Sequence, residues 1–595
     1  MYNRRMMKLL EVGLCLCLSA SSLQAQVIID AVVTGKSGFV RDLTQKDFRL
    51  SGDGKEQVIT SAALQSEAAS PQRPGKQFLA LLFDSTTVAA SDQLQIRQYV
   101  DEFLDAAAGP NRYVAVLTWF TGLKVVQPFT VDTTRLRKAL DSTMATAAMS
   151  PSGSSGSRSG VGVQDTKVQN LMQNLALLAD SLQAIRGRKA LVLFTGGYSY
   201  SADDTVFIEA ALAACNRANV AIHVISNNSA WAQEFANNTG GTAIHVTSNL
   251  PAALQKIAEE QAAYYLLNFT PSSGLEEGCH QVRLRMAAGG LDVRARRQYC
   301  ATSRDPLAGK PAGKDLESRA AGASAGVLTG TVQLPYFYTA TNQARVNVAA
   351  DLSPAGMMFR RDKGKYVGEM NVVGLALKAD GAIGARFSDV VQLSFDRQEQ
   401  AEAFTKGFFA YEAQFELPAG RYTFRMAFST GEGFGKIEVP LLIESRDSTQ
   451  LGMGGVTFGR IRRGLPTGLT TELDPTLLEG LVPLVASGFQ VAPMGTTFLR
   501  IADAPVVYTE IYTPAASGDS PAVSLQVRIL ERVSGTVKQD SGQFSIASNV
   551  VPGNRSIPVA FDVPVKLLGP GAYRLEVKAS SGASSASRTV EFELK

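Results

Sequence analysis

The stretch FLALLFDSTT, from Phe78 to Thr87, decides the fold of this chain. An unbroken apolar run ends abruptly at Asp84, and a helical pattern follows. Such a run, bounded by polar residues, is typical of a buried central strand in a parallel sheet. Ligands in such folds bind at the carboxyl ends of the strands, so we expect the polar residues to form a functional rim. This part of the predicted rim consists of Asp84, Ser85, Thr86 and Thr87.

The same pattern occurs three more times downstream. Short apolar, β-branched runs lie at YVAVLTW (Tyr113 to Trp119), KALVLFT (Lys189 to Thr195) and VAIHVI (Val220 to Ile225), with helical periodicity between them. Strands that alternate with helices predict right-handed crossovers and a sheet covered on both faces. The expected fold is a doubly wound, Rossmann-like α/β domain. The loop after the KALVLFT strand adds Gly196, Gly197, Tyr198 and Ser199 to the predicted rim.

Length and composition limit the classes of function. The chain has 595 residues, which is too long for one hydrophobic core and suggests about four domains. Its hydrophobic content of 45% and charged content of 19% are typical of globular protein. A net charge of +4 is nearly neutral over this length, and no long Lys/Arg run is present. We therefore expect no nucleic-acid partner.

The first 25 residues have the pattern of an export signal. Arg4, Arg5 and Lys8 precede an apolar run, and small residues then lead to a cleavage site before Gln26. The alternative, an N-terminal membrane anchor, is disfavoured because the run is too short to span a bilayer. We predict a secreted, periplasmic or envelope protein that is not an integral membrane protein after signal cleavage.

Three cysteines remain after cleavage. Export to an oxidising compartment favours a disulfide between two of them. Cys279 and Cys300 flank two alternating segments joined by Ala-Ala-Gly-Gly, a hairpin signal that would bring their ends together. Cys215 lies in a helical, Ala-rich stretch and is predicted to be a buried, unreactive thiol. We therefore expect Cys279 to pair with Cys300.

Turn signals and shifts in composition divide the chain. The region before the α/β domain alternates and contains an Asp53-Gly54 hairpin turn, and short alternating strands predict β-sandwiches in the C-terminal half. The predicted divisions are a signal peptide at 1–25, a small N-terminal β-unit at 27–66 packed on the α/β domain, and the α/β domain at 77–300, in which AYYLLNFTP is the last strand of the α/β unit and a β-hairpin ends the domain. They continue with a linker at 301–325, a β-sandwich at 326–445, a connecting region without a clear pattern at 446–502, and a second β-sandwich at 503–595. The Gly/Ser-rich segment at 149–162 is read as a disordered surface insertion, with a lid over the rim as the alternative.

Several blocks in this order resemble a known family. DFRLSGDGKEQVITS, the strand ending in FDSTT, LVLFTGG, NNTGGTAIHV, LPAALQKI, YYLLNFTP and VRARRQY are similar to the von Willebrand factor type A related domain of exported proteins from Acidobacteria. The resemblance covers 27–300, about half of the chain. It implies an α/β domain that takes part in protein interactions and often holds a divalent cation.

The resemblance also implies where a metal would bind. Domains of this type hold Mg²⁺ with Asp-x-Ser-x-Ser after the first strand, a distant Thr, and an Asp in Thr-Asp-Gly after the fourth strand, all hard oxygen ligands. Asp84 and Thr86 match the first two positions, but Val88 replaces the second Ser and Thr195-Gly196-Gly197 lacks the carboxylate. The distant Thr has no clear counterpart. Asp203 or Asp204 is an alternative ligand, and Asp84 could instead cap the next helix or bond rim amides. We expect an incomplete site, at most weak Mg²⁺ binding and no other cofactor.

No catalytic motif is found in the sequence. A nucleophile elbow, a phosphate loop, a dinucleotide fingerprint and a His-Glu-x-x-His pair are all missing. The chain has three histidines, and two of them, His223 and His245, lie in apolar strands, where core or strand-end positions are more usual than a role as general base. The favoured interpretation is a non-catalytic binding or scaffold protein with unidentified protein partners. The alternative is an envelope enzyme, or a subunit of one, with an unrecognised active site.

Overall fold

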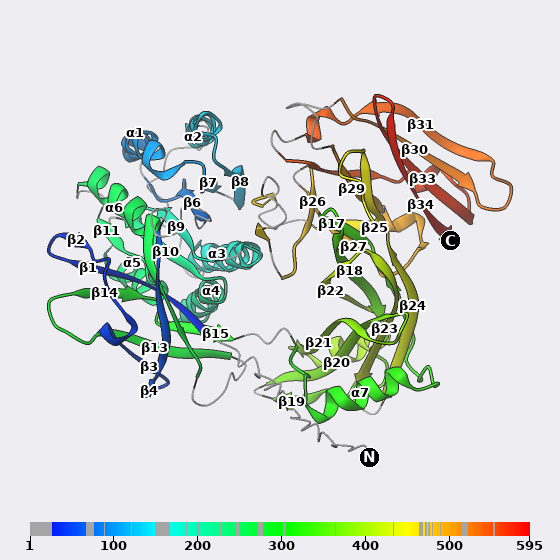
Figure 1. Cartoon of the computed structure of the whole chain (residues 1–595), viewed down its shortest axis with the longest axis horizontal. Helices are drawn as coiled ribbons and strands as arrows, with labels where there is room; N and C mark the ends of the chain where they lie inside the picture. The colour runs from blue at the N-terminus through cyan, green and yellow to red at the C-terminus, as the bar shows by residue number, and fades with distance from the viewer. Residues whose placement is uncertain are drawn as a thin grey trace, which may run out of the picture.

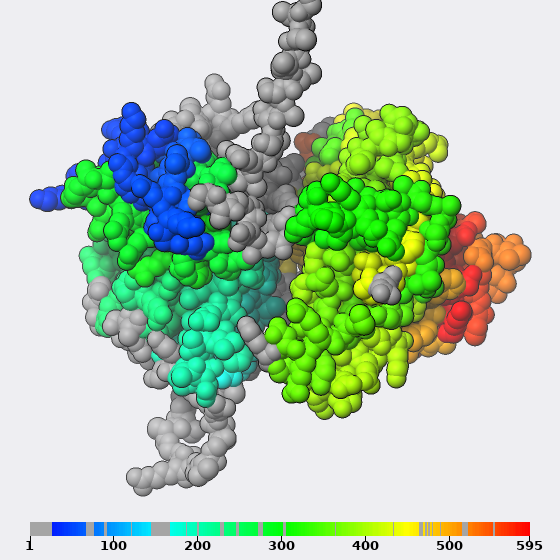
Figure 2. All heavy atoms as spheres, turned by 90° about the horizontal axis from the view of Figure 1, so that it is seen from below, coloured from blue at the N-terminus to red at the C-terminus, as the bar shows by residue number. Residues whose placement is uncertain are grey.

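The computed structural model has two lobes, one built from residues up to Ala301 and one from residues beyond it (Figure 1, Figure 2). None of the described helices is long and apolar enough to cross a membrane. The predicted signal peptide, the Gly/Ser-rich segment at 149–162 and Ser199 lie outside the described residues. The structure describes residues 27–66, 76–88, 90–120, 122–148, 167–185, 187–198, 201–226, 229–245, 249–271, 278–301, 305–362, 364–431, 433–462, 468–470, 473, 477–478, 480–487, 489–514, 522–550 and 554–595.

A six-stranded sheet forms the centre of the first lobe. Its order is β11-β10-β9-β6-β7-β8, and all neighbours are parallel except the edge strand β8. β6 lies inside this sheet, between β9 and β7, as its apolar sequence predicts. The strands are β6 (Gln77–Asp84), β7 (Arg112–Trp119), β8 (Leu123–Thr130), β9 (Lys189–Phe194), β10 (Val220–Ser226) and β11 (Ala243–His245).

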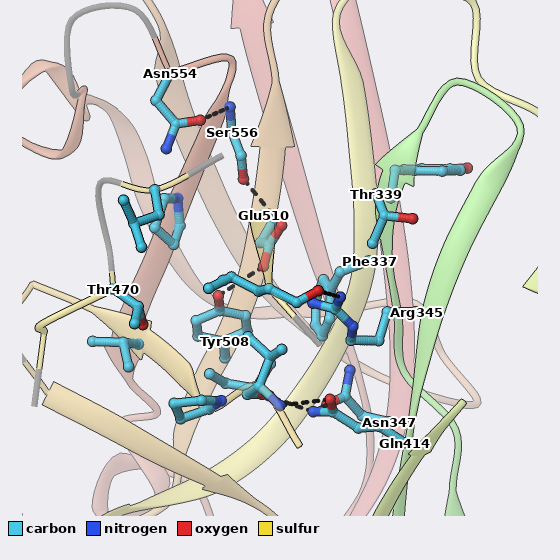
Figure 3. Close-up of a pocket in the computed structure, with 18 residues that line it drawn as sticks. Phe337, Thr339, Arg345, Asn347, Gln414, Thr470, Tyr508, Glu510, Asn554 and Ser556 are labelled. Carbon is cyan, nitrogen blue, oxygen red and sulfur yellow. Dashed lines mark hydrogen bonds between the residues drawn. The ribbon is translucent and has the colours of Figure 1, made fainter. Parts of the chain in front are cut away.

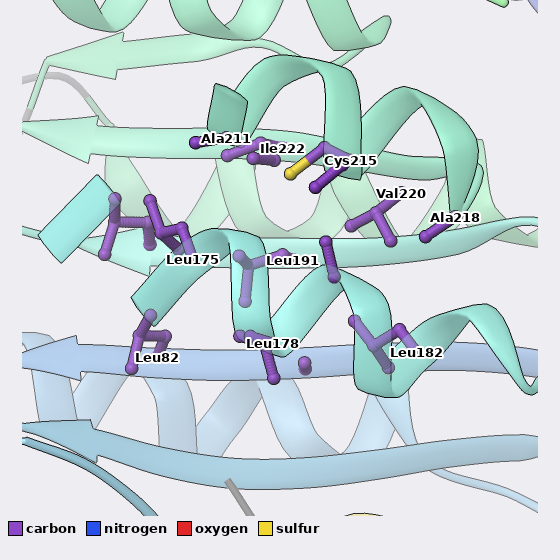
Figure 4. Close-up of a cluster of buried hydrophobic side chains, with 14 of the residues drawn as sticks. Leu82, Leu175, Leu178, Leu182, Leu191, Ala211, Cys215, Ala218, Val220 and Ile222 are labelled. Carbon is purple, nitrogen blue, oxygen red and sulfur yellow. The ribbon is translucent and has the colours of Figure 1, made fainter. Parts of the chain in front are cut away.

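Helices cover both faces of this sheet, because the side chains of each buried strand alternate between two cores. Leu79 and Leu81 of β6 join one core, and Leu82 joins the other together with the leucines of α3 (Figure 4). The first core is covered by α1 (Ala90–Ala107), α2 (Thr133–Ala148) and α6 (Leu250–Ala262). The second is covered by α3 (Lys167–Gln183), α4 (Thr205–Arg217) and α5 (Ser229–Thr239).

The N-terminal strands do not form a separate unit. β1 and β5 pair with β12, and β3 pairs with β13, so residues before and after the six-stranded sheet share two small sheets around one core. AYYLLNFTP (β12) therefore belongs to one of these small sheets and not to the six-stranded sheet. The strands are β1 (Val27–Gly35), β2 (Gly38–Phe39), β3 (Phe48–Gly52), β4 (Lys55–Gln57), β5 (Ile59–Ser66), β12 (Ala263–Phe269), β13 (Gly278–Met286), β14 (Asp292–Ala295) and β15 (Gln298–Ala301), with a short 3-10 helix, η1 (Gln45–Asp47).

The predicted disulfide is present. Cys279 of β13 and Cys300 of β15 face each other across an antiparallel pair and are bonded. The hairpin is formed only at this base, because β14 leaves β13 and pairs with β1 instead. Cys215 is free and buried in the core under α4 (Figure 4).

The first sandwich of the second lobe packs two antiparallel sheets around one core, as predicted for 326–445. One sheet contains β16 (Gly330–Gln333), β17 (Tyr336–Ala340), β18 (Gln343–Leu352) and β22 (Phe409–Pro418). The other contains β19 (Arg360–Asp362), β20 (Lys365–Lys378), β21 (Ile383–Phe395), β23 (Gly420–Thr430) and β24 (Gly433–Ile443), and α8 (Gln398–Phe404) links β21 to β22.

The second sandwich begins earlier than predicted. Its first strand, β25, starts at Gly452 and pairs with β27 and β29, so the strands found within 446–502 belong to this domain. Glycines interrupt the alternation of apolar and polar residues in β25, so the sequence did not predict this strand. One sheet contains β25 (Gly452–Arg462), β26 (Leu484–Ala486), β27 (Phe489–Pro493), β29 (Val506–Tyr512) and β32 (Ser556–Asp562). The other contains β28 (Phe498–Leu499), β30 (Ser524–Glu531), β31 (Val537–Ser545), β33 (Gly571–Ser581) and β34 (Ser584–Leu594), and the connections include η4 (Ile501–Asp503), η5 (Ala547–Asn549) and η6 (Val565–Leu567).

The region 301–325 is more than a linker. It contains α7 (Pro311–Ala321), which begins with Pro311 at a position where proline is well tolerated. Leu316 and Ala320 pack with Leu307 against Val373 and Ala427 of the first sandwich. Because this stretch is rich in Ala, Gly and charged residues, the sequence did not predict its short amphipathic helix.

A strap from the second lobe packs against the first. We use this name for the described residues at 468–470, 473, 477–478 and 480–484. Leu469, Leu473 and Leu478 join the core between α3 and the six-stranded sheet, and the Phe129 amide donates to the Leu469 carbonyl (3.2 Å). On the other side, Arg345 of β18 donates to the Leu478 carbonyl (3.0 Å). The strap thus connects the two lobes.

Candidate functional site

The rim is built around the carboxylate of Asp84, the last residue of β6. This residue is only 1% exposed. Its Oδ1 accepts hydrogen bonds from the Thr86 amide (3.0 Å) and the Thr86 hydroxyl (2.6 Å). The polar residues that follow the strand therefore turn back on its last carboxylate.

Three further hydroxyl groups reach the second carboxylate oxygen. Oδ2 of Asp84 accepts from Thr87 (2.5 Å), Thr195 (2.8 Å) and Tyr198 (2.7 Å). A carboxylate has about four lone-pair positions, and here it receives five donors from its own chain. In this arrangement donors of the chain itself occupy both oxygens of the Asp84 carboxylate. We call these five residues the hydroxyl cluster: Asp84, Thr86, Thr87, Thr195 and Tyr198.

The hydroxyl cluster joins two loops that are distant in sequence. The Gly196 amide donates to Thr87 Oγ1 (2.9 Å), and the Gly197 amide donates to Thr195 Oγ1 (3.1 Å). Each threonine thus receives an amide proton and passes its own proton to Asp84. Hydrogen bonds of the chain itself thus hold the loop after β6 and the loop after β9 together.

The missing carboxylate at position 196 has a steric reason. A Cβ atom on Gly196 would lie 2.1 Å from the Thr87 carbonyl oxygen, far inside any real contact. Any residue with a side chain, aspartate included, would therefore force the two loops apart. The close approach of the loops and the Mg²⁺ ligand expected from Thr-Asp-Gly exclude each other at this position.

Tyr198 closes the hydroxyl cluster from one side. Its ring is 8% exposed and packs edge-on against Trp231 of α5. Burial, and after it the nearby charge of Asp84, raise the pKa of the Tyr198 hydroxyl far above its ordinary value of 10. The phenol therefore stays protonated and donates to Asp84 at any physiological pH.

The alternative carboxylates do not join this cluster. Asp204 accepts from the Ser201 amide (2.8 Å), the Ser201 hydroxyl (3.0 Å) and Gln169 (3.1 Å) in the short 3-10 helix η2 (Ala202–Asp204) before α4. The Ser201 amide is the main reason that the pKa of Asp204 is lowered. Asp203 is exposed to solvent. Within the described ranges, no group of three or more His, Cys, Asp or Glu side chains could hold a metal ion.

The histidines are placed away from the rim. His223 is fully buried in the middle of β10 and bonds Thr242 through Nδ1 (2.9 Å). Burial, together with the charges of Arg188 and Arg294, lowers the pKa of His223 well below 6.5. His280 is bonded to Asp53 (2.8 Å), and His245 ends the edge strand β11. The sequence predicts core or strand-end positions for these two histidines, and the structure has His223 in the core and His245 at the end of β11 with an exposed side chain.

Sequence reasoning placed seven of the eight predicted rim residues in loops that meet, and Ser199 lies outside the described residues. It missed the role of Thr195. The signal for it lies in the register, since Phe83 of β6 faces Phe194 of β9 and the next residues, Asp84 and Thr195, become neighbours.

A second concavity lies between the two sandwiches (Figure 3). At its centre Glu510 accepts from Tyr508 (2.9 Å), Tyr512 (2.7 Å) and Ser556 (3.0 Å), and burial raises the pKa of Glu510. The cavity measures about 80 Å³. That is room for only two or three water molecules at about 30 Å³ each.

No protein-family model and no curated protein matches the chain. Among solved structures it is similar to a conserved hypothetical protein, BatB, from Bacteroides thetaiotaomicron (18% identity, 31% of this chain, 96% of that chain, TM-score 0.23). It is also similar to an aerotolerance-related membrane protein from Bacteroides fragilis (16% identity, 31% and 98%, TM-score 0.24). A third is proximal thread matrix protein 1 from the mussel byssus (13% identity, 34% and 48%, TM-score 0.24), which has also been solved with a zinc-occupied MIDAS motif. TM-scores this low do not support an argument about the function of this chain.

Proposed function

We propose that this chain is an exported, non-catalytic binding or scaffold protein whose first lobe contains a von Willebrand A type α/β domain. The proposal rests mainly on one observation. The carboxylate that would start a metal site is saturated by an amide and four hydroxyl groups of the chain itself. The rim is therefore assembled as a ready-made protein surface.

The order of the strands supports this place as the binding site. The chain runs from β6 outwards through β7 to β8, and then from β9 outwards in the opposite direction through β10 to β11. The crevice between β6 and β9 is thus the point where the strand order reverses, which is where doubly wound sheets bind their ligands. Asp84 and Thr195 flank this crevice.

The partner contacts a surface rich in hydroxyl and backbone groups. Ser85, Thr86, Thr87, Gly196 and Gly197 are all half-buried at the ends of the strands. Because such groups act by shape and hydrogen bonds, binding should not require a divalent cation. The disulfide between Cys279 and Cys300 fits a protein that works in an oxidising compartment.

The test is capture of a partner from envelope extract on the immobilised full chain, with and without EDTA. We expect retention of the partner in EDTA and its loss in Ser85→Arg, which places a large cation on the rim. Val533→Arg is the matched control, since Val533 is 91% exposed in the second sandwich. A partner that elutes with EDTA, or that is lost equally in both variants, would contradict the proposal.

A further inference from the structure

A groove lined by arginine side chains lies in the first lobe. It is bounded by β13, by β14 and by the end of α5, and it measures about 1010 Å³. The arginines that line this arginine groove are Arg49, Arg283, Arg285, Arg294, Arg296 and Arg297, and Glu56 is the acid among the lining residues.

The groove exists because the hairpin opens. β13 pairs with β15 only from Gly278 to Gln281, and β14 crosses to the other sheet to pair with β1. A hydrogen bond from the Val282 amide to the Arg297 carbonyl (2.7 Å) closes one end of the gap. Met286 and Val293, on either side of the turn between β13 and β14, line the other end. The result is a bounded recess, which suits a compact ligand better than a long polymer.

Two of the arginines are held in place by their own contacts and form one wall of the groove. Arg294 forms an ion pair with Glu260 and donates to the Gly241 carbonyl (3.0 Å). Arg296 donates to the carbonyls of Asn216 (2.7 Å) and Ile28 (2.5 Å). Its Nε is buried and has no hydrogen-bond partner within the described part of the chain. Burial lowers the pKa of Arg296, and the charge of Asp30 acts in the opposite direction.

The other arginines are exposed and close to one another. Arg285 of β13 lies directly opposite Arg49 of β3 in the antiparallel register, and Arg283 lies opposite Ser51. Side chains in such a pair are about 5 Å apart at Cβ, and like charges there destabilise a sheet. Arg283 and Arg285 lie about 6.7 Å apart along one face. Among the described residues, Arg49, Arg283, Arg285 and Arg297 form no ion pair.

We propose that the arginine groove binds a compact ligand that carries two or more anionic oxygen groups, as phosphates or carboxylates. An arginine holds either group with two parallel hydrogen bonds, and these are among the strongest in proteins. One anionic group between Arg49 and Arg285, with a second beside Arg283, relieves the repulsion across the strands. The ligand lies far from the hydroxyl cluster, so this site is independent of the function proposed for the rim.

The test is calorimetric titration of the full chain with tripolyphosphate and, separately, with citrate at low salt. We expect at least one of the two to bind with a dissociation constant below about 1 mM, and to bind more weakly as salt rises. The double variant Arg283→Gln/Arg285→Gln should weaken this binding at least tenfold. Arg421→Gln on β23, an exposed arginine of the second lobe, should leave it unchanged.

The pattern of binding identifies the chemistry. Preference for tripolyphosphate indicates a phosphate-bearing ligand, and preference for citrate indicates a polycarboxylate. The absence of binding by both probes would overturn the proposal. Equal weakening by the double variant and by Arg421→Gln would overturn it as well, since binding would then reflect total charge. Circular dichroism of the double variant checks that its sheets are intact.

Discussion

At the scale of single residues, the account depends on how closely the two rim loops approach. Asp84 accepts from both loops, and the glycine at 196 lets the backbone of the second loop lie against Thr87. Asp84 and the hydroxyl residues after it were foreseeable as a rim, because they follow an apolar strand. It could not be predicted that these residues would saturate the Asp84 carboxylate, because this depends on side-chain directions in two loops.

Gly196→Ala tests this close packing. A Cβ at 196 would lie 2.1 Å from the Thr87 carbonyl oxygen, so the loops must separate. We expect a loss of stability of about 1–3 kcal/mol, the usual effect of overpacking. Gly122→Ala is the control, because a Cβ there meets nothing within 4 Å, and it should change stability by less than about 0.5 kcal/mol. Urea unfolding of both variants measures this, and equal stabilities would argue against tight packing at the rim.

Tyr198→Phe tests the phenol in the cluster through pH. At neutral pH the variant should be less stable by about 1–3 kcal/mol, because Asp84 loses a buried donor. The raised pKa keeps Tyr198 protonated in the folded chain, whereas an unfolded tyrosine ionises near pH 10. The wild type therefore loses stability from Tyr198 as pH rises above about 10, and the variant does not. Unfolding curves from pH 8 to 11 should show the gap between them narrowing, and a constant gap would contradict this role.

At the scale of elements, strands with a clear local pattern could be predicted from the sequence. The pairing of strands that lie far apart in the chain could not. β6, β7, β9 and β10 were predictable because each is a short apolar run between helices. The pairing of β12 was not predictable, because its partners, β1 and β5, lie about two hundred residues earlier and periodicity carries no information on pairing. β25 was missed because glycines interrupt its alternation.

The disulfide anchors β13 to β15 at the base of the opened hairpin. It closes a loop of 21 residues, so removing it should cost about 3 kcal/mol by the chain-entropy model. Cys279→Ser/Cys300→Ser should show this in chemical unfolding. Cys215 should react with thiol reagents only after unfolding, because burial raises the pKa of its thiol to about 12. Peptide mapping that finds Cys215 in a disulfide would refute the assignment.

At the scale of the whole molecule, the strap makes the two lobes dependent on each other. Its leucines complete a core of the first lobe, while Gln414 of the first sandwich exchanges hydrogen bonds with Val482 (2.7 Å each way). The β-rich second half of the chain was foreseeable from its short alternating strands. The contact that the strap makes between the two lobes could not be predicted, because the strap lies in a region whose sequence has no clear periodicity.

Leu478→Ala tests the joint. Leu478 is 6% exposed in the core under α3, so the variant should lose about 2–5 kcal/mol in the unfolding of the first lobe. Leu481→Ala in the same strap is the control, since Leu481 is 54% exposed. Differential scanning calorimetry should show an earlier transition of the first lobe in Leu478→Ala alone. Identical scans for the two variants would show that the strap does not stabilise that lobe.

The central claim is that the rim is complete without a divalent cation, and calorimetric titration of the full chain with Mg²⁺ and Mn²⁺ tests it most directly. Because five donors already occupy the Asp84 carboxylate, we predict no binding tighter than about 1 mM. At millimolar Mg²⁺ such a site stabilises the fold by only about 0.4 kcal/mol. Thr86→Val, which removes one donor and keeps the side-chain shape, serves as the comparison. Micromolar binding to the wild type that is lost in Thr86→Val and in Asp84→Asn would contradict the account.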